Sequence, residues 1–149
     1  MPATTFIPNV NAVVKLDNSG GALTDVSDYV STCTVDMTAQ IGKFYVFGET
    51  GAQSAEGKRD VTASLGVRPA EDAVGASYSL NGWAMSASAM GRRTLEIDVP
   101  DSSSASFRIS GEFYLSAWQI FNQDAAGDGT PSTQTASLQA DGLPTYSVL

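Results

Sequence analysis

The sequence has no histidine, a single cysteine and few charged residues. Without histidine it can build neither a Ser-His-Asp nor a Cys-His nucleophile system, and it offers a metal no imidazole ligand. Because Cys33 is the only cysteine, an internal disulfide and a cysteine-based zinc site are excluded. Cys33 lies in an alternating stretch, so we expect it to act as a small buried hydrophobic residue. We therefore predict a protein that is not an enzyme, with no catalytic, cofactor-binding or metal-binding residues.

Basic residues are scarce as well. Eight lysines and arginines stand against 16 aspartates and glutamates, which gives a net charge of −8. Proteins that bind nucleic acid place cations on its phosphates, and proteins that dock on an anionic membrane also use cations. The negative net charge therefore argues against both functions. No segment approaches the ~18 apolar residues of a membrane span, and the first residues lack the pattern of a signal peptide. We expect a soluble acidic protein made in the cytoplasm, with one domain over residues 1–149.

Alternation of apolar and polar residues with a period of two is the dominant pattern. Such alternation predicts strands with one face in a core and one face in water. The clearest runs are 32–37, 61–67, 94–99 and 107–115. Further strand candidates are 13–16, 44–47, 133–139 and 143–148.

Three segments depart from this pattern. Residues 69–90 carry helix-start and helix-stop signals and predict one helix, or a broken one because Gly82 lies in the middle. Residues 48–57 and 122–132 have little to bury and predict long exposed loops. The predicted fold is mainly β: a β-sandwich or barrel with one packed helix and long exposed loops.

Two segments superficially match binding loops. Residues 51–59 resemble a phosphate loop, but Ala52 stands where the first glycine belongs and Arg59 replaces the magnesium-binding hydroxyl. Residues 122–129 space oxygen ligands like a calcium loop, but Ala126 and Thr133 occupy ligand positions. A solvated loop leading into a strand and a Gly-Asp-rich turn account for the two segments better.

Paired carboxylates could support glycosidase chemistry, but each pair in this sequence has a plainer explanation. Glu71 and Asp72 suit a helix start, and Glu96 and Asp98 share one strand face, which suits a solvated surface. The aromatic residues of the second half could form a platform that stacks on sugars, although such residues are more often core or interface. These aromatic residues are Trp83, Tyr114 and Trp118.

The order of several short motifs resembles the tail tube proteins of long, non-contractile phage tails. Val14–Gly21 followed by Leu23–Val30 is similar to the family's first strand, its glycine turn and a T-D-[IV]-S-x-Y-[VL] segment. Gly57–Leu65 resembles a G-x-[KR]-D-x-[ST]-[VL] strand. The remaining matches are Arg93–Ile97, the Ala105–Trp118 run and the closing hairpin Thr135–Pro144. The motifs cover most of the chain in the family's order.

This resemblance implies hexameric rings that stack into a tube, with an inner β-barrel and a helix packed outside. Double-stranded DNA would pass through without being bound, and an acidic lumen suits this because cations would slow the passage. The expected lumen-facing acids are Asp60, Glu96, Asp98 and Glu112. The expected contacts between rings are Glu49, Gln53, Glu56, Lys58, Asp124 and Asp128. The implied partners are other copies, the tape-measure protein and the tail terminator, and the implied location is the virion tail.

Two other classes stay open on the sequence alone. A capsid decoration or head–tail completion protein is also small, β-rich and symmetric, but it would not polymerise head to tail. A carbohydrate-binding β-sandwich or small glycosidase would need an exposed row of aromatics or a carboxylate with a perturbed pKa.

Overall fold

The computed structural model describes residues 12–17, 21–69, 76–85, 91–99, 107–122, 125, 127 and 132–148. Within these ranges the chain forms mostly antiparallel β-sheet with one short helix. The elements are β1 Val13–Asp17, β2 Leu23–Asp25, the 3-10 turn η1 Ser27–Tyr29, β3 Val30–Phe44, β4 Gln53–Val67, α1 Ala76–Met85, β5 Arg93–Val99, β6 Phe107–Trp118, β7 Gln134–Ala140 and β8 Thr145–Val148. The predicted mainly β fold with one helix is confirmed.

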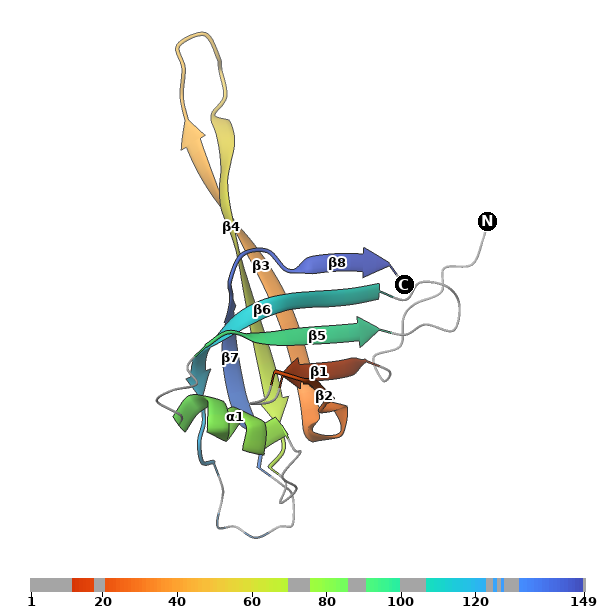
Figure 1. Ribbon diagram of the computed structural model, residues 1–149. Helices are drawn as coiled ribbons and strands as arrows, with labels where there is room; N and C mark the ends of the chain where they lie inside the picture. The colour runs from red at the N-terminus through yellow and green to blue at the C-terminus, as the bar shows by residue number, and fades with distance from the viewer. Residues whose placement is uncertain are drawn as a thin grey trace, which may run out of the picture.

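All strand pairs are antiparallel, in the order β2-β1-β5-β6-β7-β4-β3, and β8 pairs with β6. The long strand β6 joins two groups of strands, because its first half pairs with β5 and β8 and its second half with β7. Figure 1 shows β1, β5 and β6 running across the direction of β3, β4 and β7. The sheet therefore folds back over a common interior.

The alternation seen in the sequence determines which face is buried. Val61, Leu65 and Leu138 from one group of strands belong to the same buried cluster as Leu16 and Leu95 from the other. Burial of these side chains supplies the main driving force for the fold, at about 25 cal/mol per Å² of apolar surface. Helix α1 adds two fully covered side chains to this cluster, Leu80 and Trp83.

The region between residues 44 and 57 differs from its prediction. Residues 44–47 do not form a strand of their own: β3 ends at Phe44, and the chain turns over the next residues. The predicted loop 48–57 is a turn only up to Ala52, because β4 begins at Gln53. Both strands of this hairpin face water on both sides, so their sequences show no alternation of apolar and polar residues. Where these strands begin and end is determined by backbone pairing alone.

The helix prediction is confirmed for Ala76–Met85, and Gly82 lies inside the helix without interrupting it. The predicted strands at 133–139 and 143–148 are β7 and β8, with shifted ends. Glu71, Asp72 and most of the predicted loop 122–132 lie outside the described residues. Cys33 is half-buried against the core, and this burial raises the pKa of its thiol to about 11.

Candidate functional site

A two-stranded ribbon projects from the rest of the sheet (Figure 1). It consists of Met37–Phe44 of β3 and Gln53–Val61 of β4, and these residues pair only with each other because β7 reaches β4 no further than Thr62. At ~3.3 Å per residue the ribbon extends roughly 25 Å beyond the third strand. An isolated two-stranded hairpin is only marginally stable in water. A ribbon of this length therefore gains stability from any surface that covers it.

The end of the ribbon carries large apolar side chains that the described chain leaves partly or fully exposed. Phe47 is fully exposed and Tyr45 is 79% exposed, with Phe44 and Val46 nearly half exposed. We call these four residues the apolar tip. Contiguous exposed apolar side chains on a soluble protein mark an interaction surface. This exposure could not be predicted, because the residues Phe-Tyr-Val-Phe suit a buried strand equally well.

Four of the six residues predicted to contact a neighbouring ring lie on this hairpin. Glu49 is in the turn beside the apolar tip, and Gln53, Glu56 and Lys58 follow along β4. Arg59 donates to Glu56 at 2.6 Å, which lowers the pKa of the Glu56 carboxyl. The other two predicted contacts, Asp124 and Asp128, lie outside the described residues.

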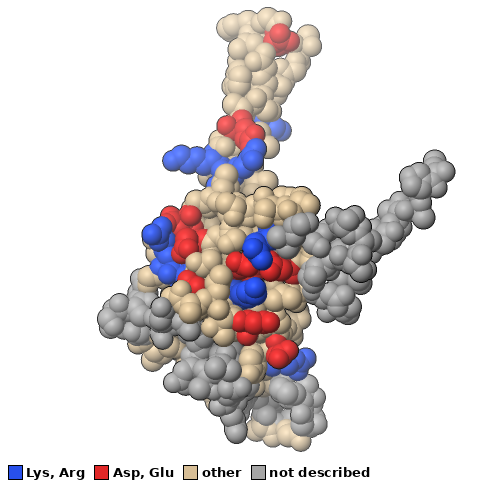
Figure 2. Space-filling model, turned by 45° about the vertical axis from the view of Figure 1, so that its right-hand side comes forward, with Lys and Arg blue, Asp and Glu red and all other residues tan. Residues whose placement is uncertain are grey.

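The strand register places the four predicted lumen acids on the same face of the sheet, the one opposite the core. Thr94, Glu96 and Asp98 alternate with core residues of β5, and Glu112 lies opposite Thr94. Asp60 lies on the same face. Gln139 on β7, which is between β6 and β4, has its side chain on this face and donates to the Asp60 carboxylate. Figure 2 shows acidic and basic side chains interleaved over the body of the molecule, and a ribbon end almost without charge.

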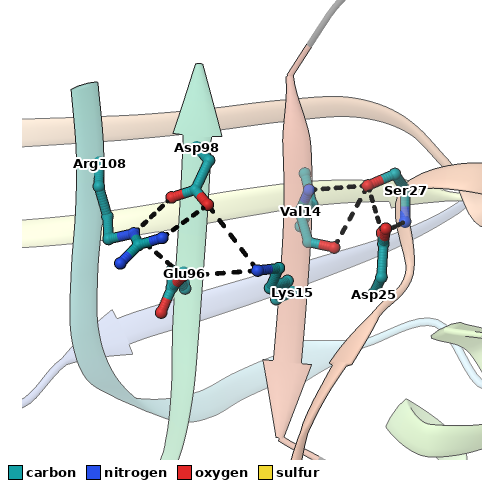
Figure 3. Close-up of polar contacts among 7 residues, drawn as sticks. All are labelled: Val14, Lys15, Asp25, Ser27, Glu96, Asp98 and Arg108. Carbon is teal, nitrogen blue, oxygen red and sulfur yellow. Dashed lines mark hydrogen bonds and ion pairs between the residues drawn. The ribbon is translucent and has the colours of Figure 1, made fainter. Parts of the chain in front are cut away.

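Two of these acids are neutralised by cations from neighbouring strands (Figure 3). Arg108 on β6 holds Asp98 through two bonds of 2.7 and 3.0 Å and lies 3.1 Å from a Glu96 oxygen. Lys15 on β1 lies 3.9 Å from both carboxylates. The hydrogen bond from Arg108 lowers the pKa of Asp98. Glu96 is buried, so its predicted place on a solvated surface is wrong.

The other two acids have no salt bridge within the described chain. Glu112 is exposed and accepts a hydrogen bond from the Thr94 hydroxyl at 2.5 Å. Asp60 is also exposed and accepts only from the neutral Gln139 amide. Asp60 and Glu112 are therefore the two acids of this set without an ion pair in the described ranges, although Glu112, after Asp141, contributes to the raised pKa of Arg92.

A polar turn fixes β1 at the edge of this charged cluster (Figure 3). The Ser27 hydroxyl accepts from the Val14 backbone N–H at 2.9 Å and donates to Asp25 at 2.6 Å. The Ser27 side chain is the main cause of the lowered pKa of Asp25. These bonds hold the 3-10 turn against β1, and the pairing of β1 with β5 places Lys15 opposite Glu96.

A groove of about 210 Å³ lies between α1 and the end of β6. Its lining residues are Trp83, Ala84, Gly91, Tyr114, Leu115, Ser116, Ala117 and Trp118. Trp118 donates to Asn81 at 2.7 Å and Trp83 donates to the Gly91 carbonyl at 2.9 Å, so both indoles are fixed. The buried Arg93 guanidinium lies 5.1 Å from the centre of the Trp83 ring.

The three aromatic residues that could form a sugar platform do meet in one groove, but they do not form an exposed row. Trp83 is 2% exposed and belongs to the core, whereas Tyr114 is 46% exposed. Within the described ranges, no group of three or more His, Cys, Asp or Glu side chains could hold a metal ion. No helix in these ranges is long and apolar enough to span a membrane.

The antiparallel sheet with its single described helix is the fold of phage tail tube proteins. No protein-family model matched the sequence, and no curated protein did. Similarity to solved structures extends over almost the whole chain. The sequence identities are low, so this similarity shows a shared fold and no more.

Three of these structures illustrate the range of the similarity. A chain from the anti-feeding prophage baseplate, 6-fold symmetrised, has a TM-score of 0.71 and 12% identity, over 99% of this chain and 96% of that chain. A chain from the sheath/tube terminator of an extracellular contractile injection system (PVC) has a TM-score of 0.71 and 10% identity, over 98% and 99%. The SPP1 tail tube has a TM-score of 0.68 and 11% identity, over 96% and 81%.

Proposed function

We propose that this chain is the repeating subunit of a phage tail tube. Copies close into rings of six, and the rings stack into a hollow tube through which double-stranded DNA passes. The fold is shared with chains of tail assemblies, one of them 6-fold symmetrised and one a tail tube. The observation that carries the proposal is the ribbon, whose apolar tip is left in water by a single copy. A head-to-tail contact repeated by every copy would cover it.

The polar face of the sheet suits the lining of such a tube. A channel that conducts DNA must not retain it, because each cation on a phosphate adds affinity that does not depend on sequence. We assign the lumen to the face that carries Asp60, Glu96, Asp98 and Glu112. Arg108 and Lys15 are held by carboxylates there, which reduces their attraction for phosphates. Asp60 and Glu112 supply the repulsive charge.

The remaining surfaces follow from the stacked arrangement. Glu49, Gln53, Glu56 and Lys58 on the hairpin contact the next ring, together with Asp124 and Asp128. The tape-measure protein fills the lumen before DNA does, and a terminator closes the stack. The protein is made in the bacterial host and resides in the virion tail as a structural component without catalytic activity.

A second candidate is a ring that ends a tube instead of extending it. The chain is as similar in fold to a sheath/tube terminator as to the baseplate chain, with a TM-score of 0.71 for each. This similarity supports the second candidate. A terminator would form single rings that bind one end of a tube, whereas a tube subunit would stack on itself without limit.

Negative-stain microscopy of the purified protein distinguishes these functions. We expect stacked rings or tubes with a central hole, and tubes that lengthen as the protein concentration rises. Single rings that never stack would favour the terminator. A monodisperse monomer at high concentration would overturn both.

A further inference from the structure

We infer that Asp141–Gly142 is a site of spontaneous isoaspartate formation, and that Arg92 restrains the reaction by holding the Asp141 carboxylate. This modification of the backbone would occur whether or not the chain forms a tube. An Asp-Gly sequence favours it, because glycine has no side chain to hinder attack by its own nitrogen on the preceding carboxyl group. The surroundings of this dipeptide in the fold leave that attack open.

The dipeptide lies in a bulge between β7 and β8. Both strands pair with the same edge of β6, because β5 occupies the other edge. β7 ends at Ala140, which pairs with Phe113, and β8 begins at Thr145. Because Thr145 pairs with Ser110, the four residues 141–144 stand opposite only two residues of β6. The extra residues take the chain out of the ladder at this point.

The bulge leaves the backbone open at Gly142. This residue has a φ of +82°, which glycine adopts without strain, and no atom lies within 4 Å of the place where a Cβ would be. Asp141 and Gly142 are both exposed to solvent. The Asp141 N–H donates to the Glu112 carbonyl at 2.9 Å, whereas among the described residues no hydrogen bond has the Gly142 N–H as its donor. The attacking nitrogen is therefore not held by the sheet.

The reaction is a dehydration followed by a hydrolysis. The Gly142 nitrogen forms a bond to Cγ of Asp141, and one carboxyl oxygen leaves as water together with the amide proton and the acid proton. The product is a cyclic succinimide. Water then opens the ring at either carbonyl: opening at Cγ restores aspartate, and opening at the original backbone carbonyl leaves the chain running through Cβ and Cγ. The water released in the first step balances the water consumed in the second.

Arg92 restrains the carboxylate in the first step. Its Nη1 donates to Oδ2 of Asp141 at 2.6 Å, and the two side chains are 53% and 41% exposed. This hydrogen bond is the main cause of the raised pKa of Arg92. Ring closure requires the carboxyl group to turn toward the Gly142 nitrogen and to lose an oxygen as water. A guanidinium on one oxygen opposes both changes, so the ion pair must open before the ring closes.

A second labile dipeptide, Asn81–Gly82, is in the opposite situation. Asparagine followed by glycine cyclises by the same attack, with ammonia as the leaving group. Both residues lie inside α1, whose regular geometry keeps the backbone nitrogen away from the preceding side chain. The Asn81 Oδ1 also accepts from the Trp118 indole at 2.7 Å. Deamidation of Asn81 therefore requires α1 to open and reports on unfolding.

Isoaspartate at residue 141 would disturb the junction between β7 and β8. It adds one carbon to the backbone shortly before Pro144, which already lies close to Gly111. It also moves the free carboxylate to a different carbon, so Arg92 loses its partner. Glu112, which after Asp141 also contributes to the raised pKa of Arg92, would be the acidic neighbour that remains.

Ageing of the full-length protein at neutral pH tests the inference. Isoaspartate is quantified by enzymatic methylation and located by electron-transfer fragmentation. Cleavage at lysine and arginine leaves residues 109–149 in one peptide, so fragmentation is needed to separate Asp141 from Asp128. Arg92→Ala removes the ion pair. Its matched control is Arg59→Ala, which removes another exposed pair of 2.6 Å, the one with Glu56.

We expect isoaspartate at residue 141 to accumulate in the wild type, and about two- to fivefold faster in Arg92→Ala, the factor that an exposed ion pair is worth. Arg59→Ala should age like the wild type. Asp141→Glu should form none at this position, because its longer side chain closes a ring far more slowly. These three results together would support both the site and the restraint.

Three results would overturn the inference. Absence of isoaspartate at residue 141 from both the wild type and Arg92→Ala would show that the site does not react. Equal rates in these two proteins would show that Arg92 does not restrain it. If Arg92→Ala accelerates deamidation of Asn81 as much as modification of residue 141, unfolding is the cause and the ion pair has no specific role.

Discussion

Arg108 and Asp98 show how a single pair of residues organises the charged face of the sheet. They lie opposite each other on β5 and β6, and the two hydrogen bonds between them fix the guanidinium in the plane of the carboxylate. The same cation lies 3.1 Å from an oxygen of Glu96, which places an opposite charge beside this buried carboxylate. A buried carboxylate without this partner would be costly.

The first prediction concerns Asp98→Asn. Hydrogen bonding to Arg108 lowers the pKa of Asp98 in the folded protein below the unfolded value of ~3.9. The stabilisation is therefore present above that value and is lost as pH falls through the folded-state pKa. We expect the variant to lose about 1–2 kcal/mol of unfolding free energy at pH 7, measured by urea denaturation.

The difference from the wild type should narrow as the pH falls below about 4. Asp36→Asn is the control, because Asp36 is exposed on the same sheet face and makes no salt bridge within the described ranges. A stability difference between Asp98→Asn and the wild type that does not change with pH would contradict this role of Asp98.

At the level of elements, β8 depends on one close approach of the backbone. β6 carries Gly111 where Pro144 crosses it just before β8, and a Cβ there would lie 2.9 Å from the Pro144 Cβ and 3.1 Å from its Cα. The proline is followed immediately by the paired strand, so it cannot move without disturbing the register of β8. The absence of a side chain at this position therefore allows β8 to join the sheet.

We predict that Gly111→Ala destabilises the protein by about 1–3 kcal/mol. Gly82→Ala is the matched control, since Gly82 lies in α1 with open space around its missing Cβ. That change should be neutral or stabilise by up to about 1 kcal/mol, because alanine favours the helix. Equal effects of the two changes in thermal unfolding would show that Pro144 is not constrained.

The ribbon should change its dynamics on assembly. In the monomer its backbone hydrogen bonds are supported by no third strand and no buried side chain beyond Val61. We expect amides of residues 53–59 to exchange with solvent much faster than those of Leu65 and Val67. In stacked rings the same amides should be protected. Hydrogen exchange followed by mass spectrometry would measure this, and fast exchange in both states would rule out a role for the ribbon in the contact.

For the molecule as a whole, the sequence predicted the core better than the surfaces. Val61, Leu65 and Leu95 alternate with polar residues, and this pattern determines both strand and face because every second side chain must be buried. The ribbon has no such pattern, since neither of its faces is buried. Its β4 half reads as a polar loop, and only pairing with β3 makes it a strand.

The charged cluster could not be predicted for a different reason. Glu96 and Asp98 were visible as neighbours on one strand, but Lys15 and Arg108 come from strands distant in the sequence. Whether an acid is exposed or compensated depends on which strands pair and in which register. The order of the motifs resembles that of tail tube proteins, and this resemblance implied the fold that the structure shows. It therefore supplied information on the fold that the residue pattern alone did not contain.

The net charge of −8 has a testable consequence in assembled tubes. We predict that tubes of the wild type do not retain double-stranded DNA at moderate salt, whereas the double change Asp60→Lys and Glu112→Lys makes them retain it. The retention should weaken steeply with salt, because phosphate contacts release counterions. Asp28→Lys, in the 3-10 turn η1 outside the strands, changes the net charge as much as either single change and is the control for Asp60→Lys and Glu112→Lys made separately. Equal retention by Asp28→Lys and the two single variants would mean that net charge, and not the lumen face, is responsible.

The central claim is that this chain builds a tube whose wall carries the polar sheet face inward. A helical reconstruction of the stacked protein by electron cryomicroscopy tests it most directly. We predict rings of six with Asp60 and Glu112 facing the central hole, and the apolar tip of each copy covered by a copy in the next ring. Rings with these two acids on the outer wall, or a protein that forms no rings, would contradict the claim.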